Sequence, residues 1–97
     1  MSTTSSILGI KHMAFAVEDI EITLDFYKKY LGVSENVEVQ DMPKSMTRVA
    51  VFNMGDIEYQ LCQSQDPNGR FNKWIKKRGQ GGLHHICYVV KNLDDAI

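Results

Sequence analysis

The chain has 97 residues, of which 43% are hydrophobic and 24% are charged, a composition typical of one small globular domain. Its 11 basic and 12 acidic side chains leave a net charge of −1, so no excess of positive charge is present to bind nucleic acid. No apolar run approaches the ~20 residues that a membrane span needs, and the N-terminus lacks the pattern of a secretory signal. The two cysteines, Cys62 and Cys87, are too few for a disulfide framework and indicate buried thiols. We therefore expect a cytoplasmic protein that binds neither nucleic acid nor membranes.

Apolar segments and turn residues predict an α+β chain of the order β-α-β-β-β, a short helix, and β again. Residues 7–17 are apolar and favour a strand. Asp19 can cap a helix whose apolar positions follow helical spacing and which ends near Gly32. The remaining predicted elements are strands over 33–42 and 46–54 around a turn at Pro43, a strand over 57–63 after a turn at Gly55, a helix from Phe71 to Gly79, a strand over 83–90, and the start of a helix over 93–97.

The sequence repeats itself with an offset of 73 residues. Residues 9–17 read Gly-Ile-Lys-His-Met-Ala-Phe-Ala-Val, and residues 82–90 read Gly-Leu-His-His-Ile-Cys-Tyr-Val-Val. Glycine, histidine and valine coincide at three positions, and nearly every other pair matches in size and polarity. Self-similarity at a fixed period indicates a duplicated supersecondary unit. We expect residues 7–78 to form one βαβββ module with a trailing helix, and residues 79–97 to begin a second, truncated module.

Strand parity predicts that several polar side chains face the same way. The repeat places His12 and His85 at equivalent positions, and Glu58, Gln60 and Cys62 share one face of the 57–63 strand. Two neutral imidazoles with an oxygen donor suit Zn²⁺, Co²⁺, Ni²⁺ or Mn²⁺. The alternative is structural, because a strand histidine is more often a hydrogen-bonded core residue than a ligand. The residues alone leave both interpretations open.

Other reactive side chains have weaker claims to function. Glu58 is interpreted as a carboxylate at the rim of the site, with a catalytic role as the alternative, and the two cysteines as core thiols. Parity places His84 on the opposite face from His85, in a structural role. The basic residues of the second helix form a solvated face or, alternatively, attract a phosphate-rich ligand: Lys73, Lys76, Lys77 and Arg78.

Two segments resemble a known family. The run from Ile10 to Ile20, followed by Phe26-Tyr27 and Leu31-Gly32, resembles the opening of the vicinal-oxygen-chelate superfamily, which includes glyoxalases and bleomycin-resistance proteins. Residues 79–90 resemble the start of the second module in the methylmalonyl-CoA epimerase branch, and the preceding helix also fits that branch. The resemblance spans residues 7–97. It implies a glyoxalase-like fold in which two βαβββ modules build a metal-binding cup.

The resemblance also implies a set of ligands. His12 and Gln60 would be the metal ligands of the first module, and His85 the first ligand of the second. A fourth ligand, usually a glutamate, would lie beyond Ile97, and many members carry glutamate where this chain has glutamine. Val49 stands where some epimerases carry a carboxylate base, so no catalytic base is assigned.

The function implied by the resemblance is that of a metal-dependent isomerase. Such an enzyme epimerises an acyl-CoA such as methylmalonyl-CoA by removing the α-proton next to a metal-chelated thioester. The alternatives are a glutathione-dependent lyase of the glyoxalase I type and a non-catalytic protein that binds a small molecule in the same cup. An isolated module leaves the edges of its sheet open, so we expect a homodimer, either simple or domain-swapped. Activity is expected of a protein with both modules rather than of these 97 residues alone.

Overall fold

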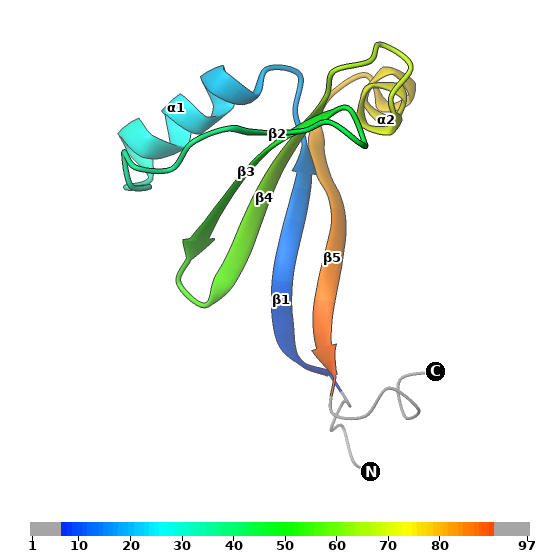
Figure 1. Ribbon diagram of the computed structural model, residues 1–97. Coiled ribbons are helices and arrows are strands. Elements are labelled where there is room, and N and C mark those ends of the chain that lie inside the picture. Colours follow the sequence, from blue (N-terminus) through cyan, green and yellow to red (C-terminus); the bar gives the residue numbers. More distant parts are fainter. Residues whose placement is uncertain (1–6, 91–97) are drawn as a thin grey trace.

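The computed structural model describes residues 7–90, which form one mixed sheet and two helices (Figure 1). The strands lie side by side in the order β2-β3-β4-β1-β5. In chain order, the elements are β1 (Ile7–Ala16), α1 (Ile20–Tyr30), β2 (Gln40–Met42), β3 (Thr47–Met54), β4 (Ile57–Ser64), α2 (Arg70–Arg78) and β5 (Gly82–Val90). The α+β class and the βαβββ order are confirmed. The helix expected over 93–97 lies outside the described residues.

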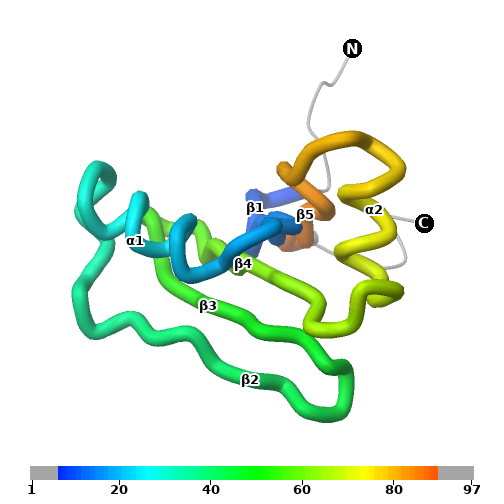
Figure 2. Tube along the Cα trace, turned by 90° about the horizontal axis from the view of Figure 1, so that it is seen from above, coloured from blue at the N-terminus to red at the C-terminus, as the bar shows by residue number. Residues whose placement is uncertain are grey.

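The two helices cover opposite faces of the sheet (Figure 2). On one face, Ile20 and Leu24 of α1 pack with Leu61 and Phe52, and Ile20 and Leu61 are fully buried. Burying a side chain of this size contributes about 1.5–3 kcal/mol. On the other face, α2 packs over the ends of β1 and β4, in a cluster made by Ala14, Ala16, Cys62, Phe71 and Ile75. Each face of the sheet therefore has a core of its own.

Helix α1 begins and ends where its sequence predicts. The Asp19 carboxylate accepts a hydrogen bond from the Ile22 amide at 3.1 Å, which satisfies one donor of the first turn. The Ile20 amide donates to the Gln63 side-chain oxygen at 2.8 Å and ties the start of the helix to β4. Gly32 follows the last turn with φ +73°, a conformation that favours glycine. Within the part of the chain that the structure describes, no helix is long and apolar enough to cross a membrane.

The strand predicted over 33–42 is wrong in its first seven residues. Only Gln40–Met42 forms β2, and residues 33–39 run irregularly beside α1. The Ser34 hydroxyl accepts a hydrogen bond from the Asn36 amide at 3.1 Å, and the Val37 amide donates to the Ser34 carbonyl at 3.2 Å. This local turn competes with strand pairing. The valines of the segment nevertheless pack against the α1 core, because burial does not require regular structure.

Ser64, the last residue of β4, holds the start of α2 in place. Its hydroxyl is buried and accepts a hydrogen bond from the Phe71 amide at 3.0 Å. The Asn72 side-chain amide donates to the Ser64 carbonyl at 3.0 Å and to the Asp66 carbonyl at 2.8 Å. Gly69, at the N-cap position, offers no side-chain cap of its own. The position of α2 on the sheet therefore depends on Ser64.

We expect Ser64→Ala to lower the free energy of unfolding by about 0.5–2 kcal/mol, because the Phe71 amide loses its acceptor. Ser45→Ala is the matched control, since Ser45 is exposed and its hydroxyl donates over a long 3.4 Å. Urea unfolding of both variants measures the difference. Equal midpoints for the two would contradict the role of Ser64 as a cap.

The pairing of β1 with β5 obeys the 73-residue offset of the repeat. Under this offset His12 corresponds to His85, and Cys87 corresponds to Ala14. The sheet contains both the pair His12–Cys87 and the corresponding pair His85–Ala14. The pair Gly9–Val89 becomes Gly82–Ala16 in the same way. A local two-fold axis therefore passes through the pair of Met13 and Ile86, which map onto each other. The two copies of the repeated segment therefore pair with each other symmetrically about this axis.

Gly81, just before β5, passes close to the end of β1. A Cβ atom on Gly81 would lie 2.5 Å from the Ala16 carbonyl oxygen and 3.5 Å from the Ala16 carbonyl carbon. Both neighbours are backbone atoms within a paired strand, so they cannot move aside without disturbing the sheet. A residue without a Cβ is therefore required at this crossing.

We expect Gly81→Ala to destabilise the fold by about 1–3 kcal/mol through this overlap. Gly9→Ala is the matched control on β1, because a Cβ there meets nothing within 4 Å. Thermal unfolding of the two variants gives the comparison. The crowding argument fails if Gly81→Ala melts at the same temperature as Gly9→Ala.

Candidate functional site

The predicted site residues lie on the same face of the sheet. Residues that pair across neighbouring strands point their side chains to the same side. One row of partners reads Glu58–His12–Cys87 across β4, β1 and β5, and the next row reads Gln60–Ala14–His85. Ala14 thus lies between Gln60 and His85, and its small side chain is fully buried under α2. The structure brings His12, Gln60 and His85 together around this small residue.

The two imidazoles approach each other directly. The ring centroids of His12 and His85 lie 5.7 Å apart, with the ring planes at 81° in an edge-to-face arrangement. His12 is half-buried and His85 is exposed. The two histidines that the repeat makes equivalent therefore meet across the β1–β5 pair.

Helix α2 covers only one end of this face. It packs on Ala14, Ala16 and Cys62, and so closes the face near the end of β1. The neighbouring residues Glu58 and Gln60 remain half-buried. The helix therefore covers the end of this face, and Glu58 and Gln60 keep part of their surface exposed.

Glu58 and Gln60 form a hydrogen-bonded pair on β4. The Gln60 amide nitrogen donates to the Glu58 carboxylate at 2.8 Å. This bond fixes the orientation of the amide and leaves the Gln60 Oε1 atom as the acceptor that can bind a cation. The carboxylate of Glu58 thus supports Gln60, a role that strand parity alone does not reveal.

The placement predicted for His84 is wrong. Its ring packs against Phe71 and Trp74 of α2, with centroids 4.9 and 5.2 Å away, so it lies on the same side as His85. The cause is a β-bulge: Ala14 pairs with His85 and Phe15 pairs with Leu83, which leaves His84 as an extra residue. Parity counting fails at such a residue because it assumes an uninterrupted strand.

His84 and His85 contact each other through their rings. Their Nδ1 atoms lie 2.8 Å apart, within hydrogen-bond distance. Burial lowers the pKa of His84, and the charges of His85 and Arg70 lower it further. Desolvation likewise lowers the pKa of His85, with smaller contributions from His12 and Arg70. A lowered pKa favours the neutral imidazole, which is the form that binds metal ions.

The residues present fit part of a divalent-metal site. Two imidazole donors and one amide oxygen match the preferences of zinc and its neighbours in the first transition row. Within residues 7–90, no group of three or more His, Cys, Asp or Glu side chains could hold a metal ion. Among the described residues, the donors that converge here are therefore the two imidazoles and the Gln60 amide oxygen.

The remaining candidates take structural positions. Burial raises the pKa of the Cys62 thiol, which belongs to the core under α2, and Cys87 is half-buried. Val49 packs against the same core. The basic side chains of α2 are exposed, and the Arg78 guanidinium lies 4.5 Å from the Trp74 ring centroid.

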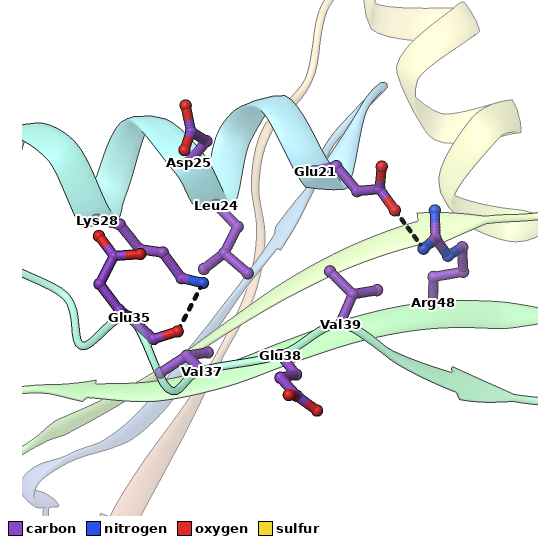
Figure 3. A pocket seen from close by; sticks show the side chains of 9 residues that line it. All are labelled: Glu21, Leu24, Asp25, Lys28, Glu35, Val37, Glu38, Val39 and Arg48. Atoms are coloured by element: carbon purple, nitrogen blue, oxygen red, sulfur yellow. Dashed lines mark hydrogen bonds and ion pairs between the residues drawn. The ribbon is translucent and has the colours of Figure 1, made fainter.

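A hollow lies on the opposite face, between α1, β3 and residues 35–39 (Figure 3). It has a volume of about 410 Å³ and carries the carboxylates of Glu21, Asp25, Glu35 and Glu38. Arg48 forms ion pairs with Glu21 at 2.8 Å and with Asp41 at 3.2 Å. The Lys28 ammonium donates to the Glu35 carbonyl at 3.1 Å. Charged partners within the chain thus already occupy much of this hollow, and no imidazole lines it.

The fold is that of a glyoxalase-like protein. Residues 11–97 match the glyoxalase/bleomycin resistance protein/dioxygenase superfamily. The chain belongs to this superfamily, which confirms the resemblance seen in its motifs.

Similarity to individual proteins points to one branch. The chain is 32% identical over 88 residues to the mitochondrial methylmalonyl-CoA epimerase of Bos taurus, covering 91% of this chain and 50% of the relative. It is 31% identical to the Homo sapiens enzyme, covering 91% and 49% of the two chains. The solved structure of methylmalonyl-CoA epimerase from Mycobacterium tuberculosis superposes with a TM-score of 0.72 at 26% identity, covering 97% and 63%. The chain spans about half the length of the curated relatives that it matches.

Proposed function

We propose that this chain provides the first half of the active site of an isomerase that epimerises an acyl-CoA, with methylmalonyl-CoA as the substrate. The observation that carries the proposal is the meeting of His12 and His85 above one face of the sheet, with ring centroids 5.7 Å apart. The similarity to methylmalonyl-CoA epimerases over 91% of the chain supports the choice of substrate. The divalent metal, such as cobalt, zinc, nickel or manganese, is part of the proposal.

His12, Gln60 and His85 would hold the metal ion. A bound divalent ion supplies Lewis-acid stabilisation of the negative charge that develops on the thioester oxygen when the α-proton leaves. Gln60 is neutral, so it would offset the positive charge of the metal ion less than a glutamate would and leave the ion more Lewis-acidic. Its amide is held by Glu58 at 2.8 Å, which presents the oxygen rather than the nitrogen.

Helix α2 determines from which side a substrate can arrive. Ala14 and Ala16 are fully buried under this helix, whereas His12 and Gln60 are half-buried and His85 is exposed. A substrate carbonyl would reach the imidazoles from the side that α2 does not cover. Val49 offers no group for proton removal, and we assign no base among residues 7–90.

We expect the protein to bind one Co²⁺ per chain. Loss of a residue that only supports a metal ligand weakens metal binding by about 10- to 100-fold. We expect His12→Ala and His85→Ala to weaken Co²⁺ binding by more than this. Isothermal titration after removal of metal with a chelator measures the affinity. Glu38→Ala is the control, because it removes a carboxylate from the acidic hollow on the other face. If Glu38→Ala loses as much affinity as the histidine variants, the metal lies elsewhere.

We further expect a metal-loaded protein that carries both modules to exchange the α-proton of methylmalonyl-CoA for deuterium from the solvent, and Gln60→Ala to slow this exchange. Proton NMR of the substrate in D₂O follows the reaction directly. Turnover of the methylglyoxal–glutathione adduct without exchange would instead identify a lyase of the glyoxalase I type. Metal binding without either reaction would identify a non-catalytic binding protein.

Two expectations from the sequence remain predictions. The homodimer, simple or domain-swapped, rests on the open edge of the sheet, and exposed Leu83, Tyr88 and Val89 on β5 are consistent with a partner there. The cytoplasmic location likewise stays a prediction. Size-exclusion chromatography with light scattering measures the oligomeric state and so tests the homodimer.

A further inference from the structure

We propose that His84 is a positioning residue for His85, which it holds in the tautomer whose Nε2 atom is free to bind a metal ion. This inference rests on the proposed function, in which His85 is a metal ligand. The observation behind it is the 2.8 Å separation of the two Nδ1 atoms. Among the described residues, the ring of His12 contacts the ring of His85 and no third imidazole.

The hydrogen bond between the rings restricts the tautomers. Both partners use Nδ1, so one of these atoms carries the hydrogen and the other accepts it. If His85 donates, its Nε2 is unprotonated and can bind a metal ion. If His84 donates, the neutral His85 carries its hydrogen on Nε2, and neither of its nitrogens is available. The proposed role therefore requires His85 as donor and His84 as acceptor.

Helix α2 fixes the acceptor in place. The His84 ring lies edge-on to Phe71 at 4.9 Å and to Trp74 at 5.2 Å between centroids. Phe71 is buried, and its amide is bound by Ser64 at 3.0 Å. The ring of His84 is thus wedged against two side chains that belong to a well-anchored helix. A hydrogen-bond partner held in this way orients a metal-binding imidazole, as partners outside the ligand set commonly do.

The repeat shows that this arrangement belongs to one copy alone. Lys11 is equivalent to His84 under the 73-residue offset, and it is likewise the extra residue of a bulge, between the pairs Ile10–Tyr88 and His12–Cys87. A lysine ammonium donates hydrogen bonds and cannot accept one. Lys11 therefore cannot do for His12 what His84 does for His85. This difference supplies a matched control.

The first test reads the tautomer of His85 in metal-free protein. Nitrogen-15 NMR of the imidazoles is recorded well above the usual histidine pKa of about 6.5, where the rings are neutral. We expect His85 to carry its hydrogen on Nδ1 in the wild type and to populate the Nε2–H form in His84→Phe, which keeps an aromatic ring between Phe71 and Trp74 but has no acceptor. His84→Asn offers an amide oxygen in place of Nδ1 and should restore the wild-type tautomer. Lys11→Ala should leave it unchanged.

The second test measures Co²⁺ affinity and the visible absorption of the bound ion. We expect His84→Phe to weaken binding by about 10- to 100-fold, His84→Asn to recover most of it, and Lys11→Ala to have no effect on either readout. Thermal unfolding of the metal-free variants shows whether His84→Phe alters the fold. If His84→Phe alters the fold, His84→Asn is compared with His84→Leu instead, because these two side chains are similar in size and only asparagine offers an acceptor.

The outcomes separate this inference from the function on which it rests. If the wild type binds Co²⁺ and His84→Phe binds it equally well, or if the His85 tautomer is the same in both, the positioning role is overturned and the proposed function stands. If the wild type binds no Co²⁺, the metal site itself fails and the positioning role fails with it.

Discussion

The pairing register of β1 is the constraint on which the rest of the structure depends. This strand lies between β4 and β5, so each of its side chains has neighbours on both sides. A slip of one residue would move His12 to the α1 side and turn Phe15 towards α2. The burial of Ala14 under α2 and the stacking of Phe15 on Tyr59 at 5.2 Å, on the other face, both oppose such a slip. The packing that stabilises the sheet therefore also determines which face carries the imidazoles.

Helix α2 links the core to the candidate site. Ala14 and Ala16 are small, so the helix can approach the sheet closely, and Ile75 completes the buried cluster. The same helix presents Phe71 and Trp74 to His84. The hydrophobic contacts that hold α2 on the sheet thus also hold the ring that contacts His85. Stability and site geometry are coupled here, since movement of α2 would change both.

Much of this arrangement could be predicted from the sequence, because the relevant signals are local. Period-two parity was enough to place His12, Gln60 and His85 on a common face, since the strands that carry them pair in phase. Parity failed at His84, where a bulge inserts one residue that no single-strand pattern reveals. It also failed over residues 33–39, whose alternating valines mimic a strand while the Ser34 turn and contacts with α1 keep the segment irregular. The pairing of β1 with β5 decided the first case, and a local turn together with packing against α1 decided the second.

The duplication explains why two imidazoles meet, and the divergence of its copies explains why they are not alike. The local two-fold axis at Met13 and Ile86 makes the positions of His12 and His85 equivalent, bulges included. Symmetry by itself would give both rings the same surroundings. Instead His12 lies opposite Glu58 on β4, whereas His85 contacts His84, whose ring rests on α2. The repeat therefore fixes where the two imidazoles lie, and contacts with β4 and α2 decide how each ring is held.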